Sequence, residues 1–101
     1  MCKKMHEHYK IKEAIWPLLE KVGFKIDSEN NEIDYCGSIR TIFINNEKRV
    51  MLEWDGEEGF GYVEVWENNA WSKLSTNVLE SKENEFQQAV EKLCKALQNY
   101  I

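Results

Sequence analysis

The stretch RVMLEWDGEEGFGYVEVWENNAWSK, residues 49–73, carries the strongest fold signal in the chain. Apolar and polar side chains alternate along it with the period of two that is typical of half-buried β-strands. Two breaks interrupt the alternation, at residues 56–59 and at Asn68-Asn69. Asparagine tolerates positive φ, which a two-residue hairpin turn requires, so the second break predicts a tight turn. We therefore expect antiparallel strands joined by two short turns.

Counting outward from both turns assigns side chains to the two faces of this sheet. If residues 56–59 form a four-residue loop, Asp55 faces Phe60, and the pairs on one side are Trp54 with Gly61, Leu52 with Val63, and Val50 with Val65. We expect this side to be the core, packed by Leu93 and Leu97. The pairs on the other side are Glu53 with Tyr62, Met51 with Glu64, Arg49 with Trp66, Trp66 with Trp71, and Glu64 with Lys73.

Apolar and polar side chains also alternate over residues 24–44, although the turn signals between the strands are weaker. Phe24 and Ile26 begin a strand, the polar run at residues 28–32 predicts a turn, and the alternation resumes from residue 33 to a bulge or bend at Gly37. Residues 38–44 are rich in β-branched side chains and continue as a strand. Their facing stays open, because loops of two or three residues after that strand put opposite side chains inward.

An amphipathic helix precedes the strands, and a second one follows them. The first apolar stripe consists of Ile11, Ala14, Ile15, Leu18, Leu19 and Val22, and the second of Phe86, Ala89, Val90, Leu93, Leu97 and Tyr100. Pro17 lacks an N–H and clashes with the preceding turn, so we expect a kink or a split near Trp16. Gly23 predicts the end of this helix at about Val22, with Phe24 in contact with Leu19.

The predicted fold class is α+β: a single domain, residues 1–101, in which an antiparallel meander of four to five strands is flanked by N- and C-terminal helices in the order α-β-β-β-β-(β)-α. Hydrophobic residues make up 43% of the chain, as in ordered globular proteins. The apolar runs are too short for a membrane span and the start lacks a signal peptide's apolar core, so we expect a cytoplasmic protein. Cys2, Cys36 and Cys94 suit free thiols better than disulfides.

Charge is segregated along the chain. Residues 26–70 hold eleven acidic side chains against three basic ones, while the whole chain has a formal net charge of −5. Exposed aromatics on a sheet are typical of single-strand nucleic-acid binders, but the net charge of −8 over residues 26–70, eleven acidic less three basic side chains, would repel phosphates, so we expect no direct nucleic-acid binding. A surface of aromatics ringed by carboxylates instead favours a basic protein partner. The residues expected to contact that partner are Glu53, Asp55, Glu57, Glu58, Tyr62, Glu64, Trp66 and Trp71.

Catalytic and metal-binding patterns are weak. Residues 55–59 place three carboxylates in a loop but lack the ligand spacing of an EF-hand, and Cys2, His6 and His8 offer three zinc donors at a polar N-terminus without a fourth. Cys36 has no nearby histidine in the sequence to act as a base, and Cys94 lies beside an apolar stripe. We therefore expect no enzyme activity, no metal and no cofactor.

Three functional hypotheses follow. The leading one is a stoichiometric inhibitor or immunity-type protein that engages a basic, nucleic-acid-handling macromolecule through the aromatic and acidic sheet face. The alternatives are a homo-oligomeric adaptor or chaperone-like module, including a homodimer, and a small-molecule-binding domain. All three depend on which face each helix covers. With one helix on each face, Tyr62, Trp66 and Trp71 would be core residues; with both on one face, they would be open to contact.

Overall fold

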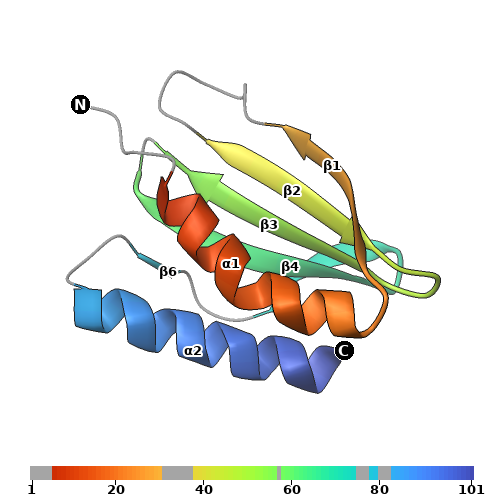
Figure 1. The fold of residues 1–101 in the computed structure, drawn as a ribbon. Coiled ribbons are helices and arrows are strands. Elements are labelled where there is room, and N and C mark those ends of the chain that lie inside the picture. The colour runs from red at the N-terminus through yellow and green to blue at the C-terminus, as the bar shows by residue number, and fades with distance from the viewer. Residues whose placement is uncertain (1–5, 31–37, 57, 75–77, 80–82) are drawn as a thin grey trace.

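The computed structural model describes residues 6–30, 38–56, 58–74, 78–79 and 83–101, which form two helices and one antiparallel sheet (Figure 1). The elements are α1 (His6–Lys21), β1 (Lys25–Asn30), β2 (Ile39–Ile44), β3 (Arg49–Asp55), β4 (Phe60–Glu67), β5 (Ala70–Lys73), β6 (Val78–Leu79) and α2 (Glu83–Tyr100). Strands β1 to β5 are ordered as in the sequence, and β6 pairs with β4 beyond the end of β5. The predicted α+β class and antiparallel meander between terminal helices are confirmed.

The two hairpins around β4 have the predicted registers. Leu52 pairs with Val63 and Asp55 with Phe60 across β3 and β4. Trp66 pairs with Trp71 across β4 and β5. Asn68 and Asn69 have φ angles of 54° and 63°, so this turn uses the left-handed backbone that asparagine tolerates.

The β2–β3 loop settles the facing of β2. Ile44 pairs with Arg49, which leaves a four-residue loop at 45–48. The Asn45 side chain stabilises this loop, because its Oδ1 accepts hydrogen bonds from the backbone N–H groups of Glu47 and Lys48 at 2.9 and 2.7 Å. The register then places Thr41 opposite Leu52, and both are fully buried on the core side.

Helix α1 runs through Pro17 without a break, which excludes the split that was one of the two alternatives predicted at this position. Pro17 and Glu13 are both exposed, and water can therefore satisfy the Glu13 carbonyl that loses its helical partner. The helix ends at Lys21, next to the predicted Val22, and the following Gly23 has a φ of 85°. The N–H groups of Gly23 and Phe24 donate to the carbonyls of Glu20 and Leu19, both at 3.1 Å, which is the Schellman pattern.

The predicted turn at residues 28–32 is wrong for its described part. Ser28, Glu29 and Asn30 belong to β1 and pair with Ile42, Thr41 and Arg40 of β2. The polar side chains are tolerated because β1 forms an edge of the sheet, and all six of its residues are exposed. A register shift between Ile26 and Ser28 makes the strand bulge. The strand and bend expected over residues 33–37 lie outside the described residues.

Both helices pack on the same side of the sheet (Figure 1), around the core face predicted from the hairpins. Leu52, Val63, Leu93 and Leu97 belong to one buried cluster, each at most 1% exposed. The members that the two helices contribute to this cluster are Ile11, Ile15, Leu19, Phe86, Val90, Leu93 and Leu97. Both helices therefore cover the core face of the sheet, and neither helix covers the opposite face.

Candidate interaction surface

The sheet face without a helix is the candidate site, and we call it the open face. Its members alternate with the core residues along β2 to β5 and are Arg40, Ile42, Ile44, Arg49, Met51, Glu53, Asp55, Phe60, Tyr62, Glu64, Trp66, Trp71 and Lys73. Six of the eight residues predicted to contact a partner belong to it. Glu58 lies in the adjoining β3–β4 loop, and Glu57 falls outside the described residues.

Aromatic side chains form two pairs on the open face. Trp66 and Trp71 meet edge to face across the β4–β5 hairpin, with ring centroids 5.3 Å apart. Phe60 and Tyr62 are stacked along β4 with centroids 6.0 Å apart. All four side chains are half-buried. The open face therefore presents aromatic surface near both ends of β4.

The Glu53 carboxylate is held by two neighbouring strands. Its Oε1 accepts a hydrogen bond from Arg40 Nε at 2.6 Å, and its Oε2 accepts one from the Tyr62 hydroxyl. Burial raises the pKa of Tyr62, and the hydrogen bond donated to Glu53 and the charge of that carboxylate raise it further. Arg40, Glu53 and Tyr62 thus form a polar lock across β2, β3 and β4.

Cations lie over the aromatic rings of this face. Lys73 Nζ is 4.8 Å from the ring centroid of Tyr62, and the Arg49 guanidinium is 5.6 Å from that of Trp66. The pKa of Glu64 is raised, first by burial and then by repulsion from Glu53, while Lys73 and Arg40 act in the opposite direction. The open face consequently carries mixed charge, with three cations among its carboxylates.

The acidic loop between β3 and β4 is organised by Asp55. The Asp55 Oδ1 accepts a hydrogen bond from the backbone N–H of Glu58 at 3.0 Å, and its carbonyl accepts one from Gly59 at 2.8 Å. Within the described residues, no three His, Cys, Asp or Glu side chains lie close enough together to hold a metal ion.

A shallow hollow of about 190 Å³ lies at the acidic end of the open face, beside the polar lock. Its lining residues are Ser38, Ile39, Arg40, Glu53, Trp54, Asp55, Phe60 and Tyr62. Pockets for drug-sized ligands are typically about 300–1,000 Å³. The hollow suits one side chain of a partner better than an enclosed small molecule.

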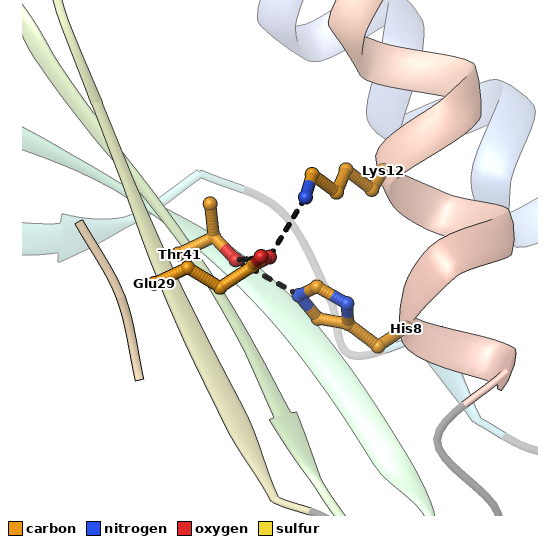
Figure 2. A network of polar contacts seen from close by, with 4 residues as sticks. All are labelled: His8, Lys12, Glu29 and Thr41. Carbon is orange, nitrogen blue, oxygen red and sulfur yellow. Dashed lines mark hydrogen bonds and ion pairs between the residues drawn. The ribbon is translucent and has the colours of Figure 1, made fainter. Parts of the chain in front are cut away.

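A second polar group, between α1 and the sheet, was missed by the sequence reasoning (Figure 2). His8 was assigned to a polar N-terminus, but it is fully buried and belongs to α1. The signal was present in the spacing, because His8 lies three residues before Ile11 and on the same helical stripe. Its Nε2 is 3.1 Å from Thr41 Oγ1, which in turn donates to Glu29 Oε1 at 2.7 Å.

The hydrogen-bond directions in this group show which ring nitrogen of His8 carries the donated hydrogen. Because the Thr41 hydroxyl hydrogen goes to Glu29, Thr41 accepts from His8 Nε2–H, and Nδ1 is left as the unprotonated nitrogen. Burial lowers the pKa of His8 to about 4; the Glu29 carboxylate acts against this shift, and Lys12 adds to it. The imidazole is therefore neutral at physiological pH.

Lys12 completes the group from α1. Its Nζ donates to Glu29 Oε1 at 2.8 Å. Burial raises the pKa of Glu29, but the hydrogen bonds from Lys12 and Thr41 and the attraction of the neighbouring positive charge together outweigh burial, and the net pKa is lowered. This network ties α1 to the edge strand β1 and to its neighbour β2, and its geometry is that of a structural tether.

Cys94, the cysteine within the described residues, lies at the contact between the two helices. Cys94 is half-buried, and its Sγ–H donates to the Ala14 carbonyl at 3.8 Å, between α2 and α1. Burial raises the pKa of this thiol, and the Glu91 carboxylate adds to the effect. A raised thiol pKa disfavours the nucleophilic thiolate.

In the described part of the chain, neither helix is long and apolar enough to cross a membrane. Comparison of the chain with protein-family models, with curated protein sequences and with solved structures gives no significant match in any of the three.

Proposed function

We propose that the chain is a small, non-enzymatic, cytoplasmic binding protein whose open face contacts a positively charged macromolecule. The observation that carries this proposal is the placement of both helices on one side of the sheet, which leaves Tyr62, Trp66 and Trp71 without a covering helix. Tyrosine and tryptophan are the side chains most often found as energetic anchors of protein interfaces.

Charge supports a basic partner. The net charge of −5 attracts a cationic protein over distances of about a Debye length, roughly 8–10 Å at physiological salt. Glu53, Asp55 and Glu58 lie at one end of the open face and its adjoining loop, beside the hollow. A lysine or arginine side chain of the partner fits there by size and by charge.

The role we favour is that of a stoichiometric inhibitor or immunity-type protein. Such a protein needs a surface complementary to its partner and no reactive group, and the uncovered aromatic rings with carboxylates beside them support this role. A nucleic-acid-handling partner suits the proposal because its phosphate-binding site is basic, and the carboxylates at the acidic end of the open face, beside the aromatic rings, can occupy such a site in competition with the polynucleotide.

The test is a differential capture experiment with three immobilised proteins. These are the wild type, an open-face variant with Trp66→Ala and Glu58→Lys, and a control with Tyr9→Ala and Glu20→Lys. Tyr9 and Glu20 are exposed on α1, on the other side of the sheet, so the control has the same change in charge and aromatic content.

We expect a basic protein to be retained by the wild type and the control and to be lost from the open-face variant. With that protein purified, Glu58→Lys alone should mainly slow association at low salt, and Trp66→Ala alone should mainly speed dissociation. A basic partner that binds all three proteins equally would place the interface elsewhere.

A further inference from the structure

Charge on the open face is graded along the strands. Arg49 begins β3 and Asp55 ends it. Lys25 of β1 lies near Arg49, since both pair with Ile44. Glu53 lies near Asp55, and the neighbouring Arg40 is already engaged with Glu53 at 2.6 Å. One end of the open face is therefore cationic and the other is anionic.

The aromatic residues follow the same symmetry. Leu52 and Val63 are cross-strand partners at the middle of β3 and β4. Arg49 and Asp55 lie three positions on either side of Leu52, and Trp66 and Phe60 lie three positions on either side of Val63. A half-turn about an axis that lies above the open face over this central pair, perpendicular to the strands and parallel to the sheet, exchanges the two ends.

We propose that the open face also binds a second copy of this chain, packed face to face about that two-fold axis. In this arrangement Arg49 of each copy meets Asp55 of the other, and Trp66 of each copy meets Phe60 of the other. Two ion pairs and two aromatic contacts form from one surface, as an isologous interface requires. The aromatic rings near both ends of β4 lose water on contact, and the charges set the orientation.

The opposite orientation is disfavoured by the same residues. A two-fold axis along the strands would place the two cationic ends together and the two anionic ends together, and an axis over β3 would bring Arg49 onto Arg49 and Asp55 onto Asp55. Like charges facing each other across an interface are strongly unfavourable. The charge gradient thus selects the antiparallel arrangement. This inference does not require the proposed basic partner, which would compete with the second copy for the open face.

A charge-swap experiment tests the inference. Wild type, Arg49→Asp, Asp55→Arg and an equimolar mixture of the two variants are studied by sedimentation equilibrium from micromolar to millimolar concentrations. We expect the wild type to dimerise and each variant alone to associate about tenfold more weakly or worse, because its ends then carry like charges. The mixture should recover association, since each new charge meets its opposite in a heterodimer.

Matched controls separate these effects from changes in net charge and from unfolding. Lys21→Asp and Glu20→Arg make the same charge changes on exposed positions of α1 and should leave dimerisation unchanged. Asp55→Asn keeps an acceptor for the Glu58 N–H and should weaken the dimer less than Asp55→Arg. A wild type that stays monomeric throughout, or a dimer that neither charge reversal weakens, would overturn the inference, and so would a mixture of folded variants that fails to associate.

Discussion

The indole of Trp54 lies over Gly61, its cross-strand partner on the core face. A Cβ atom placed on Gly61 would lie 2.6 Å from Trp54 Cε3, 3.0 Å from the Glu53 carbonyl oxygen and 3.2 Å from Ile11 Cδ1. Glycine is therefore needed here for space, and the missing side chain lets α1, β3 and β4 approach one another.

Gly61→Ala is expected to lower the free energy of unfolding by roughly 1–3 kcal/mol, because the new methyl group overpacks the core. Urea unfolding followed by tryptophan fluorescence measures the change. Gly23→Ala is the comparison: nothing lies within 4 Å of its Cβ, and its cost comes from the φ of 85° alone. Gly23→Asn should then cost less than Gly23→Ala, and a harmless Gly61→Ala would show that Trp54 lies elsewhere.

Unfolding stability should fall as the pH drops from about 6.5 to 4. The folded-state pKa of His8 is about 4, below the ordinary histidine value of 6.5, so the unfolded chain binds a proton in this window and the folded chain does not. The loss reaches up to about 3 kcal/mol at the acid end. The lowered pKa of Glu29 acts in the same direction, because its stabilising contribution is lost on protonation.

His8→Gln should reduce the slope of stability against pH in that window, as measured by urea unfolding at a series of pH values. Thr41→Val, which removes the hydroxyl between His8 and Glu29, should lower stability at pH 7 but leave the His8 contribution to the slope in place. If His8→Gln left the slope unchanged, the His8 imidazole of the wild type would have an ordinary pKa in the folded protein.

Leu52→Ala is expected to cost roughly 2–5 kcal/mol, because it opens a cavity beneath both helices. Leu52 is fully buried and belongs to the same cluster as Val63, Leu93 and Leu97. Ile26→Ala is the matched control, since Ile26 on the edge strand is 42% exposed and should cost less than about 1 kcal/mol. Denaturant unfolding measures the loss of unfolding free energy in both variants. Similar losses in the two would contradict the assigned core.

Tyr62 should ionise at a higher pH than an ordinary tyrosine, since burial, its hydrogen bond to Glu53 and that carboxylate's charge all raise its pKa. Glu53→Gln should lower this pKa, because it removes the nearby negative charge while keeping an acceptor. Spectrophotometric titration of tyrosinate measures the change, with Tyr62→Phe assigning the signal. If the titration were the same in the wild type and in Glu53→Gln, the polar lock would not form.

Local rules were sufficient for the two hairpins. The Asn68-Asn69 turn and the four-residue loop after Asp55 set the strand registers, and a strand's side chains alternate strictly once its register is known. The same reasoning identified the core face and eight of the open-face residues. These features depend on residues that are close in sequence, so they can be predicted from the sequence alone.

The sheet's edge was not recoverable in this way. Residues 28–30 read as a turn because they are polar, yet pairing with β2 makes them part of β1. His8 read as part of a polar terminus, yet the packing of α1 buries it against Thr41. In both cases a contact with a distant segment outweighs local preference, and that contact is not encoded in the local pattern.

The sequence by itself determined the element types, the hairpin registers and the pairing of aromatic with charged side chains on one sheet face. Only the tertiary structure decided that this face is open. Each helix has an apolar stripe that fits either side of a sheet, so hydrophobic patterning alone does not choose between them. The choice comes from burying both stripes and the Leu52–Val63 face in one core, which leaves the alternate residues of the same strands uncovered.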